Sequence, residues 1–201
     1  MSDHLRLSGL PADAQANTLR EIIGGSTLLT DVLARMRSLD LPDCWLVSGA
    51  IYNTVWNHLT GRAPLTGIND IDLFYFDAGD LSYDAEDRAI KTAEKVFAGL
   101  PLPVQLRNQA RVHLWYPERF GITYAPLGSS CEAVDRFATI AHSVAARLDR
   151  AGDIELYAPF GLDDVFSFRL VPNRTLDNRL THEKKGARAR SVWPEIVVEP
   201  W

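Results

Sequence analysis

Asp70 and Asp72 are the two residues whose type and spacing point most directly to chemistry. They begin a largely apolar run, residues 70–76, that predicts a buried strand. Side chains alternate along a strand, so both carboxylates project from one face, with their Cα atoms about 7 Å apart. Mg²⁺ prefers oxygen ligands and often uses one or two carboxylates together with substrate phosphates. The spacing therefore predicts a shared Mg²⁺ or Mn²⁺ site of the kind that supports phosphoryl transfer.

An Asp-x-Asp pair can also belong to a solvated strand face. Here Phe74 and Phe76 continue the face of the aspartates. The other face is uniformly apolar and consists of Ile71, Leu73 and Tyr75. The strand is therefore expected to be buried on both faces beyond its start. Two carboxylates at the mouth of such a strand repel each other and lose hydration, which raises at least one pKa unless a cation offsets them. On spacing alone both interpretations stay open.

Ser48 and Gly49 follow a short apolar strand predicted over residues 43–47 and precede a helix predicted over residues 50–59. A helix N-terminus presents unpaired amides and a partial positive charge, which suits phosphate. Gly49 lets the backbone approach a ligand closely, and Ser48 either caps the helix or donates to a phosphate oxygen. Asn53, about one turn along that helix, is a further candidate for nucleotide binding. The alternative is a plain helix cap.

Helices and strands alternate around these candidate residues. Helices are predicted over residues 15–39, with a break at Gly24-Gly25 and a cap at Ser26, and from Ser82 to about residue 97. A third strand is predicted around residues 104–109 and is expected to continue through Val112 to Trp115. Further segments are two strands at 143–148 and 154–157, a short helix after Gly161, and a last helix at 181–190. This order predicts an α/β (α+β) fold with a mixed sheet flanked by helices.

The charge distribution argues against a protein that binds nucleic acid over a broad surface. The net charge is −5, and such binding depends on the neutralisation of phosphates by basic residues. One local exception lies between residues 179 and 190, where Glu183 is the single acid among five basic residues: Arg179, Lys184, Lys185, Arg188 and Arg190. This basic cluster is either a solvated C-terminal helix or a group that holds the phosphates of a nucleotide or of an RNA end.

Length and composition predict one domain over residues 1–201, with a core at about 26–170 and a C-terminal extension of helix and strand at about 171–201. No apolar stretch approaches the roughly 18 residues of a membrane helix. The first residues lack the basic and apolar pattern of a signal peptide. We therefore expect a cytoplasmic protein without a membrane partner, in which Cys44 and Cys131 are reduced thiols.

The succession of a strand, a Ser-Gly turn, a helix and an Asp-Ile-Asp strand resembles the polymerase-beta-like nucleotidyltransferase superfamily. The chain is similar in particular to a family of small bacterial nucleotidyltransferase-like proteins, over roughly residues 44–195. The segments that carry the resemblance are residues 48–57, 68–77, 108–116 and 157–166, followed by Pro172-Asn173.

The resemblance implies metal-dependent transfer of a nucleoside monophosphate from a nucleoside triphosphate to an acceptor that it does not identify. Ser48 and Gly49 would hold the triphosphate. Asp70 and Asp72 would be the catalytic pair and would ligate Mg²⁺ or Mn²⁺.

The superfamily also has a third carboxylate on the following strand, and residues 104–109 contain no acid. Gln105 or Asn108 can offer a carbonyl oxygen to a cation, and Asn108 is the expected third metal ligand. Neither amide can accept a proton as a carboxylate would. Two alternatives to catalysis therefore remain: a non-catalytic nucleotide-binding module on the same fold, and an RNA- or protein-interaction domain that uses the basic cluster.

Overall fold

The first two helices form where apolar residues recur at helical spacing. They are α1 (Ala12–Gly24) and α2 (Thr27–Met36). Between them, the side chain of Ser26 accepts a hydrogen bond of 3.3 Å from the backbone N–H of Leu29. This bond satisfies one of the free amides at the start of α2. The predicted break at Gly24-Gly25 and the predicted cap at Ser26 are confirmed.

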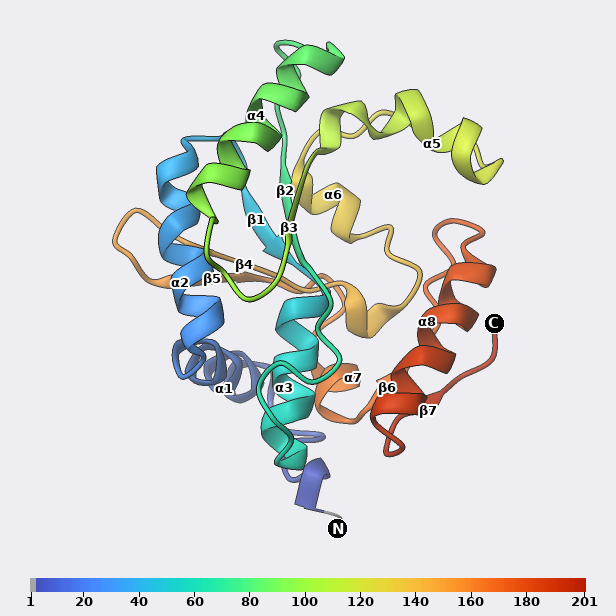
Figure 1. Cartoon of the computed structure of the whole chain (residues 1–201). Coiled ribbons are helices and arrows are strands. Elements are labelled where there is room, and N and C mark those ends of the chain that lie inside the picture. Colours follow the sequence, from blue (N-terminus) through green and yellow to red (C-terminus); the bar gives the residue numbers. More distant parts are fainter. Residues whose placement is uncertain (1–2) are drawn as a thin grey trace.

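The computed structural model, which describes residues 3–201, contains a five-stranded sheet in the order β3-β2-β1-β4-β5 (Figure 1). The parallel pair β2·β3 is connected by α4 (Tyr83–Val96), and the other neighbours are antiparallel. The fold is therefore mixed α/β, as predicted. The strands are β1 (Trp45–Val47), β2 (Ile71–Tyr75), β3 (Val104–Asn108), β4 (Ala145–Leu148) and β5 (Ile154–Tyr157).

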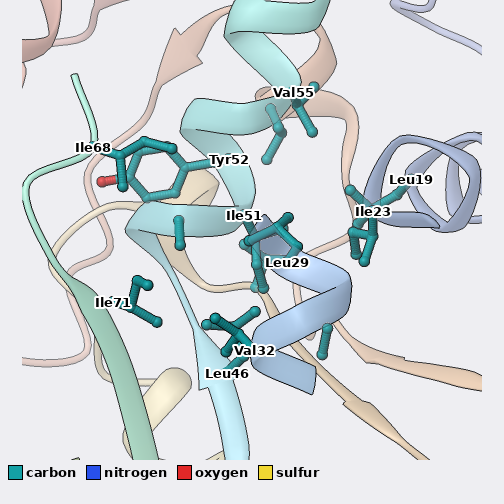
Figure 2. Close-up of a cluster of buried hydrophobic side chains, with 14 of the residues drawn as sticks. Leu19, Ile23, Leu29, Val32, Leu46, Ile51, Tyr52, Val55, Ile68 and Ile71 are labelled. Carbon is teal, nitrogen blue, oxygen red and sulfur yellow. The ribbon is translucent and has the colours of Figure 1, made fainter. Parts of the chain in front are cut away.

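One face of the sheet carries the main hydrophobic core. It packs against α1, α2 and α3 (Gly49–Thr60). Figure 2 shows Leu46 of β1 and Ile71 of β2 turned toward Val32 of α2 and Ile51 of α3, and all four residues are buried. This layer fixes the position of α3 relative to β1 and β2, and with it the turn at Ser48-Gly49.

The opposite face is less completely covered. Asp72 and Phe74 lie on it and are half-buried, so the prediction that β2 is buried on both faces is met only in part. The covering elements are α5 (Val112–Phe120), α6 (Ser130–Val134) and α8 (Arg179–Val192), which lie across the sheet from α2 in Figure 1. Of these, α5 and α6 were not predicted as helices.

The predicted continuation of the third strand through Val112 to Trp115 is wrong. β3 ends at Asn108, and the chain enters α5 through a 3₁₀ turn, Gln109–Arg111. The side-chain oxygen of Asn108 accepts a hydrogen bond of 3.1 Å from the backbone N–H of Ala110. Such a local bond favours a turn over continued strand pairing.

The C-terminal extension is tied to the rest of the fold. A short helix, α7 (Asp163–Phe166), leads into β6 (Arg169–Leu170), which pairs in parallel with β7 (Val197–Val198). The buried indole of Trp193 donates a hydrogen bond of 3.1 Å to the side-chain oxygen of Asn57 in α3. The C-terminal extension is therefore packed against α3 as part of the same folded unit.

The remaining elements are short 3₁₀ turns. The longest helices, α4 and α8, have 14 residues each, and none within residues 3–201 is long and apolar enough to cross a bilayer. The turns are Asp3–Leu5, Arg37–Leu39, Gln109–Arg111 and Ile140–His142.

Two glycines with similar φ angles test how firmly the C-terminal segment is held. Gly67 has a φ of +72°, and a Cβ there would lie 2.2 Å from Cη2 of Trp193. Gly61 has a φ of +65°, and a Cβ there would meet nothing within 4 Å. Substitution by alanine costs about 1 kcal/mol at either site because φ is positive. At Gly67 it must also displace the indole, so we expect Gly67→Ala to reduce the free energy of unfolding by about 2 kcal/mol more than Gly61→Ala. Urea denaturation measures both values, and equal losses would contradict the packing of Trp193 on Gly67.

Candidate active site

A cavity of about 170 Å³ lies at the end of the sheet where β1 runs into α3. The antiparallel register places Val47 opposite Asp72, so the turn at Ser48-Gly49 lies beside the carboxylate pair. All the predicted site residues except Asn108 line this cavity: Ser48, Gly49, Asn53, Asp70 and Asp72. The structure therefore brings together residues from two separate segments of the sequence.

Asp70 and Asp72 both face the cavity, as the alternation of a strand predicts. The pKa of Asp72 is raised from 3.8 to about 6. Burial is the main cause, and the charge of Asp70 adds to it, while Lys185 and Arg107 act in the opposite direction. The pair thus has the electrostatic character of a cation site, because a bound cation would offset both the repulsion and the lost hydration.

Gln105 lies beside the carboxylate pair, and Asn108 does not. Gln105 is the register partner of Asp72, and its Nε2 donates a hydrogen bond of 2.7 Å to Asp70. Asn108 pairs with Tyr75 and is buried on the opposite face of the strand. Its side chain bonds the backbone of Asp77 and Ala110. The expectation that Asn108 is a metal ligand is therefore corrected, because residues an odd number of positions apart point to opposite faces of a strand.

Ser48 makes the turn from β1 to α3 in one residue, with a φ of +59° and a ψ of −113°. A non-glycine residue in such a region costs on the order of 1–3 kcal/mol, and such residues concentrate at functional sites. Its backbone N–H donates a hydrogen bond of 2.8 Å to the carbonyl of Val144. Its side chain makes no capping bond to α3. The alternative that Ser48 is a plain helix cap is not supported.

The cavity leaves open space beside Gly49 and Asn53 at the start of α3. A Cβ at Gly49 would meet only Nδ2 of Asn53 and the hydroxyl of Tyr52, both at 3.9 Å. The packing of the protein itself therefore does not require glycine here. Asn53 lines the cavity and donates a hydrogen bond of 3.4 Å to the carbonyl of Gly67. The free amides at the start of this 12-residue helix are available to an anion.

Lys185 and Arg188 of the basic cluster also line the cavity. They are three residues apart and so share one face of α8. Arg188 donates a hydrogen bond of 2.8 Å to the carbonyl of Gly67. Lys185 remains exposed at the rim, close enough to Asp72 to lower the pKa of that carboxyl. Arg179 pairs with Glu183 instead, so the cluster is divided between the cavity and the surface.

His142 completes the wall of the cavity as a neutral group. Its ring stacks on that of Tyr52 at 4.6 Å between centroids. Burial lowers the pKa of His142 well below its ordinary value of 6.5, and the charge of Lys185 adds to the effect. His142 is therefore uncharged at neutral pH and adds no further cation to this site.

Two observations bear on metal binding. No group of three or more His, Cys, Asp or Glu side chains is arranged to hold a metal within the described part of the chain. Mg²⁺ commonly uses one or two carboxylates and completes its shell with water and phosphate oxygens, so the Asp70–Asp72 pair fits this chemistry.

A larger hollow of about 840 Å³ lies elsewhere, between α1, α2 and α3, and does not contain the pair.

Both the sequence and the mixed sheet of this chain have counterparts among known proteins. Residues 34–198 match the family model described as "Nucleotidyltransferase", and the chain belongs to this family. A structure solved by NMR, whose title says that it "reveals a CCA-adding enzyme head domain", is 26% identical, with a TM-score of 0.73 over 92% of this chain and 96% of that chain. No curated protein matches. The predicted family and fold are therefore confirmed.

The raised pKa of Asp72 predicts an unusual response of stability to pH. The carboxyl binds a proton more tightly in the folded state, near pH 6, than in the unfolded state, near pH 3.8. Its contribution to stability is therefore fully present below pH 3.8 and is lost as the pH rises through 6. We expect Asp72→Asn to increase the free energy of unfolding at pH 7.5 by up to about 2 kcal/mol. Denaturation in EDTA at pH 7.5 and 5.0 measures this, and the difference from wild type should shrink at pH 5.0. A loss of stability at both pH values would mean that Asp72 supports the fold.

Proposed function

We propose that the protein is a metal-dependent nucleotidyltransferase, which transfers a nucleoside monophosphate from a nucleoside triphosphate to an acceptor. Membership of the family supports nucleotidyl transfer in general. The observation that carries the proposal is the pair Asp70 and Asp72, which shares one cavity with the N-terminus of α3 and the basic residue Lys185. Anionic ligands for a cation and cationic groups for a polyphosphate thus lie in a single site.

Each residue has a role in this reaction. The hydroxyl of Ser48 and the backbone amide of Gly49 bind the outer phosphates, and Lys185 and Arg188 offset their charge. Asp70 and Asp72 hold Mg²⁺ or Mn²⁺, which supplies neutralisation of the charge on the transferring phosphate. An acceptor oxygen forms a bond to the α-phosphorus, the bond to the bridging oxygen breaks, and pyrophosphate leaves. Positioning and charge neutralisation account for most catalysis of this type.

One observation favours a second candidate, a nucleotide-binding module without catalysis. Gln105 occupies the register position beside Asp72, and its amide donates to Asp70. An amide cannot take the proton of an acceptor hydroxyl. Release of pyrophosphate in the presence of a suitable acceptor would exclude this candidate, and nucleotide binding without release would favour it.

The cytoplasmic location expected from the sequence stays a prediction.

The carboxylate pair provides the main test. We expect wild type to bind a non-hydrolysable nucleoside triphosphate in calorimetry when Mg²⁺ or Mn²⁺ is present, and to lose this binding in EDTA. Asp70→Asn combined with Asp72→Asn should abolish the metal-dependent binding, because amides are weaker ligands and leave the phosphate charge uncompensated. Circular dichroism would check that the double variant is folded. Equal binding by wild type and the folded double variant would refute the proposal.

Adjacent lysines on α8 provide a matched comparison. Both lysines are exposed, but only Lys185 lines the cavity. We expect Lys185→Met to weaken triphosphate binding about tenfold, since a charge-assisted contact is worth about 1.5–3 kcal/mol. Lys184→Met should change the dissociation constant by less than about twofold, because an exposed lysine outside the site contributes little. Calorimetry at two salt concentrations would measure both variants, and equal effects would assign the lysines to general attraction of anions.

A further inference from the structure

A second cavity, of about 240 Å³, continues along the same face of the sheet beyond Asp72. Phe74, two residues after Asp72 on β2, and Arg107, its register partner on β3, form its floor. Lys185 lines both cavities, so the two are neighbours. The proposed triphosphate site does not account for this second cavity, which we call the aromatic cavity.

Rings from several elements surround the aromatic cavity. Phe74 and Phe137 lie 5.7 Å apart between centroids, and Tyr116 lies 4.6 Å from Phe120 and 4.4 Å from Tyr124. Phe120 is 45% exposed. The guanidinium of Arg119 lies 5.4 Å from the centroid of Phe120, and that of Arg136 lies 4.7 Å from the centroid of Tyr124, so these rings already contact planar cationic groups. A base can stack on the exposed ring in the same way, and base-aromatic stacking contributes about 1–3 kcal/mol per base.

Arg107 adds a cation to the floor of this cavity. Its side chain is exposed, and it forms no ion pair with any residue of the part of the chain that the structure describes. Its one side-chain hydrogen bond there, 2.8 Å long, goes to the backbone carbonyl of Leu106 on its own strand. A guanidinium with free donors beside a ring-lined cavity suits a phosphate attached to a planar ring.

The register of the sheet indicates which substrate belongs here. The start of α3, where the outer phosphates bind in the proposed function, lies at the Asp70 end of β2. The aromatic cavity lies at the other end, beyond Asp72. In an in-line displacement the acceptor approaches the phosphorus from the side opposite the leaving group. The acceptor would therefore approach from the aromatic cavity.

We propose that the aromatic cavity binds the acceptor, and that this acceptor is a nucleotide unit whose base stacks on the rings and whose phosphate contacts Arg107. This assignment rests on the proposed function. The cavity is smaller than the roughly 300 Å³ of ordinary ligand sites, so it holds one such unit. The unit is either a free nucleotide or the terminal residue of an oligonucleotide.

Binding of the four ribonucleoside monophosphates tests the assignment, and Trp115, which lines the cavity, provides a fluorescence signal. The triphosphate site is first saturated with a non-hydrolysable nucleotide and Mn²⁺. We expect at least one monophosphate to bind with a signal that Trp115→Phe removes. Arg107→Ala and Phe120→Ala should each weaken this binding about tenfold, and Phe120→Ala, which is remote from the carboxylate pair, should change triphosphate binding by less than twofold. Leu114→Ala is the matched control, because Leu114 is 54% exposed on the same helix and lies outside the cavity.

The outcomes separate this assignment from the proposed function. Monophosphate binding that survives in the Asp70→Asn, Asp72→Asn variant and is lost in Phe120→Ala supports the aromatic cavity, even if triphosphate binding fails. Monophosphate binding that competes with the triphosphate and ignores Phe120→Ala overturns the assignment and leaves the proposed function standing. No binding by any monophosphate or by a short single-stranded oligonucleotide also overturns it. Tenfold tighter binding of the oligonucleotide identifies a strand end as the source, and equal affinities identify the free nucleotide.

Discussion

The burial of Asp72 beside the second carboxylate, Asp70, is the interaction that connects the site with the C-terminal part of the fold. The pleat of β2 sends both side chains into one cavity, and burial makes the charge of Asp72 costly there. Lys185 offsets part of this cost and comes from α8, near the end of the sequence. α8 must therefore be held against the sheet, and the contacts of Gly67 with Trp193 and Arg188 help to do this. The cavity and the C-terminal segment therefore depend on each other.

The parts of the site that could be predicted are those set by local rules. Asp70 and Asp72 are two positions apart, so strand alternation alone brings them together. Ser48 and Gly49 stand at a change from strand to helix, which the hydrophobic pattern reveals. Lys185 and Arg188 could not be assigned in the same way. Their spacing of three places them on one face of a helix, but only the tertiary structure shows that this face closes the cavity.

The two errors on the third strand have related physical causes. The alternation of polar residues from Arg107 onward resembles a continuing strand, but the side chain of Asn108 bonds the amide of Ala110 and starts a turn. The choice of Asn108 over Gln105 depended on which face of β3 meets the carboxylates of β2. The alternation within β3 does carry this information, because Val104 and Leu106 share the face of Asn108 and turn toward the core, whereas Gln105 and Arg107 are exposed on the other face. The structure turns Asn108 into the protein and Gln105 toward the carboxylates.

The amide of Gln105 changes what the site demands of an acceptor. A third carboxylate beside Asp72 would raise its pKa further, so the neutral amide relieves the electrostatic cost of the pair. The same replacement removes a group that could take a proton from an attacking hydroxyl, and the lowered pKa of His142 makes this cavity residue a weak base. A phosphate oxygen carries no proton to remove at neutral pH and needs only orientation and charge neutralisation. Arg107, exposed between the carboxylates and the aromatic rings, is placed to provide both for such an oxygen. The chemistry of the site thus favours an acceptor that is already ionised over one that must be activated by a base.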